Sequence, residues 1–250
     1  MNDQLSLRRF AFVLRNDLMR TYRSVLLIAG TAALAALVVS LSGAYDGDVG
    51  EGTLFYRVFF IAMLFTWGTI ATSVCFSDLH GRGTNTAFLL LPASALEKTA
   101  SRLLVYTVGL IAFLLLFTTL LSFLLEGINT LWIGERRGFF SPLDEVSWPL
   151  LPHFLVAQAL FFLGAAWFRK VWWIKTFGAV IGIVIGLAAI AAGLGWMIGP
   201  LQCLNASCYQ FPLFDWLGDA APVAYFYLLP PFCWFVAWLR VSEAQVSHGI

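Results

Sequence analysis

The residues that could do chemistry are few, and their spacing matches no catalytic motif. The three histidines, His80, His153 and His248, lie far apart in the chain. The sequence has no His-Glu-x-x-His, no Gly-x-Ser-x-Gly and no glycine loop with the lysine that binds phosphate. We therefore expect no catalytic residue, no bound metal and no nucleotide site in this chain.

Composition predicts a membrane protein. Of the 250 residues, 60% are hydrophobic and 12% are charged, whereas soluble domains carry about 25% charged residues. Such a chain cannot cover one soluble core with a polar surface, so lipid must solvate much of it. A net charge of +1 without a basic block argues against nucleic acid as a partner.

Six segments are long and apolar enough to cross the hydrocarbon, which takes about 20 residues of helix. They cover residues 24–42, 54–76, 103–125, 150–168, 176–198 and 221–239. With the N-terminus inside, all of the 15 basic residues except Arg57, Arg136 and Arg137 fall on the cytoplasmic side. The positive-inside rule thus predicts an all-α protein with both termini, including the tail 241–250, in the cytoplasm.

Residues 1–23 carry apolar side chains at helical spacing, and arginines at Arg8, Arg9, Arg15 and Arg20. This pattern predicts an amphipathic helix in the membrane interface, with its arginines toward anionic headgroups. The alternative is a plain cytoplasmic extension of the first span.

The four cysteines form two groups. Cys75 and Cys233 lie within spans, where a thiol is a small apolar filler. Cys203 and Cys208, in "CLNASC", follow the fifth span on the predicted outer side. We expect a Cys203–Cys208 disulfide there rather than a metal site, because no second pair or nearby histidine completes one.

Polar residues inside the predicted spans are rare. Arg57 lies near the outer end of span two, where it can snorkel to the interface, the alternative being a place on a substrate path. His153 and Gln158 lie on span four, each in reach of a neighbouring helix. Because the spans hold no acidic residue that could couple transport to ions, any uphill work needs energy from a partner.

Two spans carry packing signals. Gly178, Gly182 and Gly186 recur every four residues on span five, which predicts close helix association within the chain or across a dimer. Pro230 and Pro231 lie in the middle of span six, where they remove two backbone donors and should kink or break the helix. We expect that span to face protein more than lipid.

The loop 77–102 is the largest predicted cytoplasmic insertion between spans. "AFLLLP" within it is too short to cross a membrane, so it is either a docking surface with an exposed apolar face or a plain connection touching the membrane surface. Ser94 and Glu97 have the spacing of a capping box, which predicts a helix start that leads into span three.

The stretch "CFSDLHGRGTNTAFLLLPASALEKTASRLLVY" resembles the loop between the second and third spans of ABC transporter permease subunits of the type-2 export class. The likeness of this motif covers about 30 residues, and the six-span architecture is similar. The resemblance implies a half-transporter in the bacterial inner membrane, paired with a second permease and with two cytoplasmic ABC ATPase subunits. ATP and Mg would then bind to those partners, with no cofactor in this chain.

The resemblance also implies site residues. The coupling contact with the ATPase would involve Gly81, Arg82, Thr84, Phe88, Leu89, Leu90 and Leu91. Glu97, Lys98 and Arg102 would stiffen the following helix or touch the ATPase rim. Two other classes stay open: a structural or signalling subunit without transport, and an intramembrane enzyme, against which the scarcity of clustered polar residues argues.

Overall fold

The computed structural model describes residues 6–45, 52–81, 88, 91, 93–132, 134, 138–141, 147–168, 172–202 and 220–247. Within these ranges every regular element is a helix, and six helical segments are long and apolar enough to cross a membrane. The prediction of an all-α chain with six candidate spans is thus confirmed.

The six candidate spans coincide with the predicted ones and extend beyond several of them. The first is α1 (Leu7–Tyr45), and the second joins α2 (Gly52–Ala62), π-helix η2 (Met63–Trp67), α3 (Gly68–Ser73) and α4 (Ser77–His80). The third joins α6 (Ala95–Leu104), π-helix η3 (Val105–Gly109) and α7 (Leu110–Trp132). The others are α8 (Leu150–Trp167), α9 (Trp172–Gln202), and π-helix η4 (Ala224–Leu228) with α11 (Leu229–Ser247).

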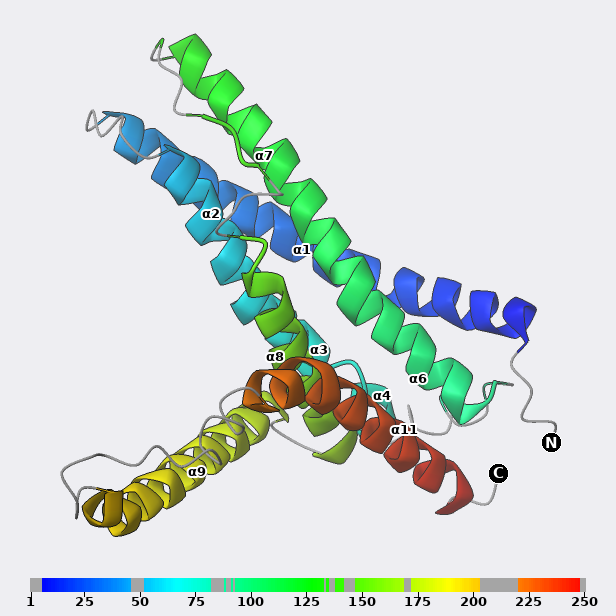
Figure 1. Ribbon diagram of the computed structural model, residues 1–250. Helices are drawn as coiled ribbons and strands as arrows, with labels where there is room; N and C mark the ends of the chain where they lie inside the picture. Colours follow the sequence, from blue (N-terminus) through cyan, green and yellow to red (C-terminus); the bar gives the residue numbers. More distant parts are fainter. Residues whose placement is uncertain are drawn as a thin grey trace.

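The helices form two groups that meet at α3 and α8. Figure 1 shows α1, α2 and α7 running together toward one end, while α11 crosses α8 at the other. One apolar cluster joins α2, α7 and α8 through Phe60, Leu114 and Phe154. A second joins the end of span two to α8 and α11 through Phe76 and Phe162, whose rings meet edge to face at 5.0 Å. These two clusters fix the second span relative to the rest of the bundle.

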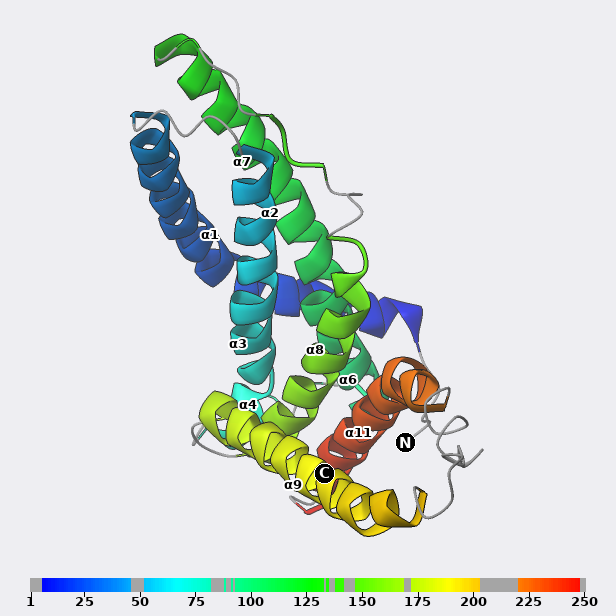
Figure 2. The same ribbon diagram turned by 60° about the vertical axis from the view of Figure 1, so that its left-hand side comes forward.

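The N-terminal segment and the first span are one continuous helix, from Leu7 to Tyr45. Figure 2 shows its N-terminal, dark blue part turning away from the upright remainder. The placement of this part in the membrane interface stays a prediction.

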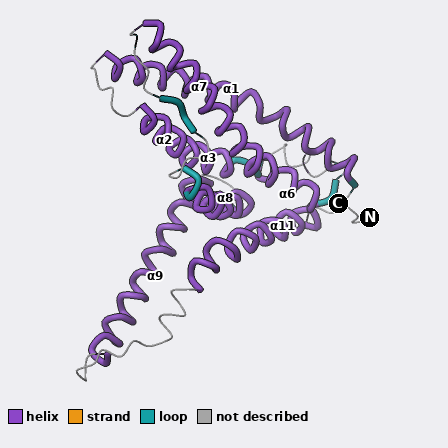
Figure 3. The backbone as a smooth tube through the Cα atoms, turned by 45° about the horizontal axis from the view of Figure 1, so that its top comes forward, coloured by secondary structure: helices purple, strands orange, loops and turns teal. Residues whose placement is uncertain are grey.

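Helix α9 extends away from the other helices, as the tube in Figure 3 shows. It packs near its start against α8 and α3. A Cβ atom added at Gly178, Gly182 or Gly186 would meet nothing within 4 Å among the described residues. The glycine face is therefore not used for packing in the described part of this chain, and its use across a dimer stays a prediction.

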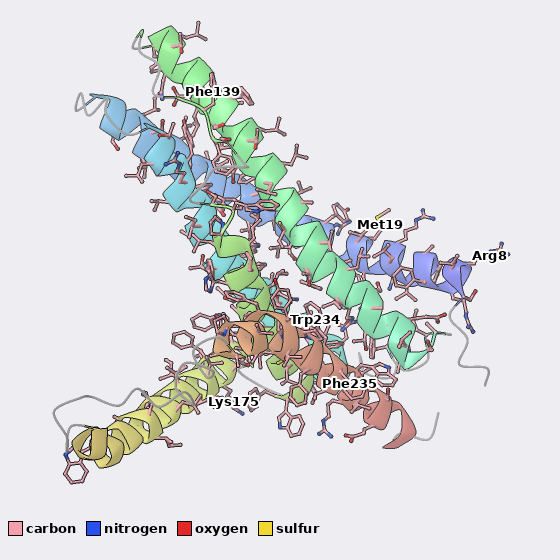
Figure 4. All side chains as sticks on the ribbon, viewed as in Figure 1. Arg8, Met19, Phe139, Lys175, Trp234 and Phe235 are labelled. Carbon is pink, nitrogen blue, oxygen red and sulfur yellow. The ribbon has the colours of Figure 1, made fainter. Side chains whose placement is uncertain are left out.

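The last span continues through its prolines without a break, from residue 220 to Ser247. The turn before Pro230 and Pro231 is π-helical. Because proline cannot donate a backbone hydrogen bond, the wider turn accommodates the lost bonds. Gln158 and the two cysteines within spans have the surroundings that the sequence predicts. Trp234, which is labelled in Figure 4, donates its Nε1–H to Gln158 Oε1 at 3.4 Å, and Cys75 and Cys233 are buried free thiols.

We expect Gly164→Ala to destabilise the contact between α8 and α9. A Cβ atom at Gly164 would overlap Thr176 Oγ1 and would lie 2.7 Å from Thr176 Cγ2. Overpacking of this kind costs about 1–3 kcal/mol, so thermal unfolding in detergent should begin at a lower temperature. Gly30→Ala on α1 is the control, because its added methyl group would meet nothing within 4 Å among the described residues. Equal melting of both variants would contradict the close approach of these two helices.

Candidate functional site: a buried polar junction

The helix that leads into span three begins with the predicted capping box. Ser94 Oγ accepts a hydrogen bond from the Glu97 backbone N–H at 3.2 Å, and Glu97 Oε2 accepts one from the Ser94 backbone N–H at 2.9 Å. The two side chains thus satisfy two of the backbone donors that a helix start leaves open. The sequence prediction is confirmed, and α6 has a fixed first turn.

The same carboxylate also holds the N-terminal helix. Glu97 Oε1 accepts a hydrogen bond from the backbone N–H of Ser6 at 2.9 Å and lies 3.5 Å from Arg9 Nη2. The Glu97 side chain is fully buried. One buried carboxylate therefore caps α6 and ties the start of α1 to it, although the residues lie about 90 positions apart in the chain.

A second set of polar contacts joins α1, α4 and α6 further along. Asp17 Oδ2 accepts a hydrogen bond from Ser101 Oγ at 2.7 Å. Asp78 Oδ2 pairs with Arg20 from α1 and with Arg102 Nη2, the latter at 3.1 Å. Arg102 also donates to the carbonyl of Cys75. Asp78 is thus shared between two guanidinium groups that belong to two different spans.

Aromatic rings enclose the cationic side of these contacts. The Arg102 guanidinium lies 4.4 Å from the ring centre of Phe88 and 5.2 Å from that of Phe76. Lys98 Nζ lies 5.1 Å from the same Phe88 ring. Cations over aromatic faces are attracted by the ring quadrupole, most strongly where water is excluded. Phe88 is 3% exposed and belongs to the second apolar cluster, so the loop between spans two and three is anchored at this point.

We call this set of side chains the polar junction. It consists of Arg9, Asp17, Arg20, Asp78, Glu97, Lys98, Ser101 and Arg102. Because α1, α4 and α6 each contribute charges that another element neutralises, the junction fastens the ends of spans one, two and three together.

The contacts of Glu97 suit a charged carboxylate. Its oxygens accept hydrogen bonds from the backbone N–H groups of Ser6 and Ser94 and lie beside the Arg9 guanidinium, and such charge-assisted contacts stabilise the carboxylate although its side chain is buried.

The structure brings together only part of the predicted coupling set. Arg82, Thr84, Leu89 and Leu90 lie outside the described residues, as do Cys203 and Cys208. Gly81 ends α4 in an extended conformation, and Leu91 is half-buried. Phe88, Glu97, Lys98 and Arg102 are buried inside this chain. Their side chains therefore support the loop from within, and direct contact of these four with a partner's rim does not fit their burial.

Several junction residues had weak signals in the sequence. Asp17 is the only acidic residue in the arginine-rich stretch from Ser6 to Arg23, and Asp78 is the only one between Ser77 and Ala93. An isolated acid among cations or apolar residues is a candidate ion-pair partner. Which cation each acid meets depends on how the spans pack, and no local spacing predicts that.

The contacts of the polar junction hold helices together and do not form a site typical of catalysis. Each of its three acids pairs with a basic or a hydroxyl group, and within the described ranges no three His, Cys, Asp or Glu side chains group closely enough to hold a metal ion. Comparison of the chain with protein-family models, with curated proteins and with solved structures found no match.

We expect Glu97→Ala to loosen the starts of α1 and α6 together. It removes the acceptor of the Ser6 and Ser94 amides, and hydrogen bonds to a charged group contribute about 1.5–3 kcal/mol each. Hydrogen exchange followed by mass spectrometry should show faster exchange in the peptide that contains the start of α1 and in the one that contains the start of α6. Glu97→Gln, which keeps an acceptor for the cap, should lie between this variant and the wild type.

Glu243→Ala is the control for this experiment. Glu243 is exposed and forms an ion pair with Arg240, three residues earlier on α11, at 2.8 Å. Such a pair contributes about 0.2–0.5 kcal/mol, so exchange at the junction should be unchanged. Wild-type exchange in Glu97→Ala would refute the joining role of the carboxylate.

Proposed function

We propose that the chain is the membrane-spanning permease subunit of an ATP-driven ABC exporter or flippase of the type-2 export class. The observation that carries the proposal is the anchoring of the loop between spans two and three. Asp78 before the loop, Phe88 within it and Ser94 after it are all held by side chains of the same junction. A short segment that is fixed at both ends and in its middle is suited to receive force.

The helix that follows the loop can transmit such force. From Ala95 to Trp132 the third span is helical throughout, with η3 as a π-helical insertion. A 38-residue helix is about 57 Å long, well over the roughly 30 Å of hydrocarbon. A displacement at the capped end would therefore be carried across the membrane, and through Glu97 and Asp17 it would also move α1.

The proposal includes a topology and partners. Both termini lie in the cytoplasm of a bacterium, and the six spans lie in its inner membrane. Two cytoplasmic ATPase subunits bind ATP and Mg, and each contacts the loop of one permease. A second permease completes the path, with the open glycine face of α9 as a packing surface for it. Differential affinity of the ATPases for two permease states then biases the conformational change.

The test is to replace Leu89, Leu90 and Leu91 with aspartate. Three new charges in the proposed docking segment should abolish co-purification of the ATPase, because a buried unpaired charge opposes docking. Membrane insertion of the permease should persist. The control is Leu131→Asp with Trp132→Asp, two residues that are 85% and 81% exposed at the far end of α7.

The control variant should keep the ATPase bound. A permease with the three aspartates that still co-purifies with its ATPase would refute the docking segment. Purification of the wild type as an oligomer without any ATPase would instead favour a structural or signalling subunit, the other class that the sequence leaves open.

A further inference from the structure

A cavity of about 720 Å³ lies beside the polar junction, between α1, the end of span two and the start of span three. Ligand sites are typically cavities of about 300–1,000 Å³ with mostly apolar walls and a few placed polar groups. This cavity fits that description, since its charged side chains gather at the junction end and its other walls are largely apolar. Figure 2 shows the three elements that form it, α1, α3 and the helix of span three.

Each wall runs from a charged residue to an apolar one. Along α1 the lining residues extend from Asp17 to Ile28, and along span three from Arg102 to Phe113. Along span two they extend from Asp78 back to Trp67. Each stretch contains 12 residues, and the distance from its first to its last residue is roughly 16 Å at about 1.5 Å per residue. That is close to half of the roughly 30 Å hydrocarbon thickness, the depth of one leaflet.

The cavity opens to the side, where lipid would lie. Leu18 and Leu26 on α1 are 50% and 61% exposed, and Ile70 on α3 is 39% exposed. All three line the cavity. Apolar rims of this kind give a hydrocarbon chain lateral access to the groove from the surrounding bilayer, without a passage through water.

Two π-helices contribute to the walls. Trp67 ends η2, while Val105, Tyr106 and Gly109 belong to η3 on the facing span. A π-helical turn costs hydrogen-bond geometry and occurs frequently at functional sites. Here the two widened turns lie across the same cavity, which is a second observation, independent of its charges, that the groove is built for an occupant.

Two charged side chains at the junction end of the cavity are accessible, one basic and one acidic. Arg102 is 4% exposed in its side chain, and Asp17 is 8% exposed, so both are occupied within the junction. The Arg20 side chain is 48% exposed and that of Asp78 is 26% exposed, and these two form an ion pair. The charged residues that line the cavity are two acids, Asp17 and Asp78, and two bases, Arg20 and Arg102, so their charges sum to zero. A headgroup with both a phosphate and an ammonium keeps that balance, whereas a ligand with a single charge would leave one charge in excess.

We propose that the groove binds one zwitterionic phospholipid of the leaflet on the junction side. The headgroup phosphate pairs with Arg20 and the ammonium with Asp78, and an acyl chain lies along Val25, Ala71 and Leu110 toward Phe113. The site needs neither the ATPase nor transport, so it stands apart from the proposed function and can fail without it.

The test is native mass spectrometry of the full purified chain with phosphatidylethanolamine and phosphatidylglycerol of identical acyl chains. The wild type should retain one phosphatidylethanolamine in preference to phosphatidylglycerol. Ala71→Phe and Val25→Trp fill the groove from opposite walls, and each should weaken that binding at least about tenfold. Ala62→Phe, at an exposed alanine of the same span that does not line the cavity, should bind as the wild type does.

Asp78→Asn tests the headgroup directly. It keeps the side-chain shape but removes the negative charge, so the preference should shift from the zwitterionic to the anionic lipid. Equal binding of the wild type and the filled variants would mean that only annular lipid is present and would overturn the site. A wild-type preference for phosphatidylglycerol would overturn the zwitterionic occupant.

Discussion

The constraint on which the arrangement depends is that buried charges must be paired. Glu97, Lys98 and Arg102 are at most 3% exposed at the end of a long apolar helix. Isolated charges in such a place would cost several kcal/mol each, so they stay only with partners. The partners of Glu97 come from α1 and those of Arg102 from span two, while Lys98 lies over the ring of Phe88. The contacts that stabilise the buried charges of α6 therefore also fix the positions of α1 and of span two.

The groove and the junction are two consequences of the same contacts. Because Asp17 and Asp78 hold α1 and span two at the junction, the helices enclose a space further along, where apolar residues line it. Phe88, whose ring lies against Lys98 and Arg102, also anchors the loop between spans two and three. The ion pair between Arg20 and Asp78 belongs to both the junction and the groove. Force on the loop and a ligand in the groove would thus act on the same ion pair.

The sequence was sufficient for local features and insufficient for those that depend on packing. The six spans and the Ser94 capping box follow from residue types at short spacing, and the structure has both. The burial of Phe88 and the hydrogen bond between Asp17 and Ser101 depend on how separate segments of the chain pack together. No periodicity in the sequence predicts such contacts. Loop leucines look alike in sequence whether they dock a partner or fill a core.

The most direct measurement of the junction as one rigid unit is the distance between spin labels on α1 and α6. Met19 is 58% exposed and Leu96 is 38% exposed, so labels at these positions disturb little. Pulsed electron paramagnetic resonance should give one narrow distance distribution in the wild type. Asp17→Asn combined with Ser101→Ala should broaden it. A broad or two-peaked distribution in the wild type would contradict a junction that holds the two helices together.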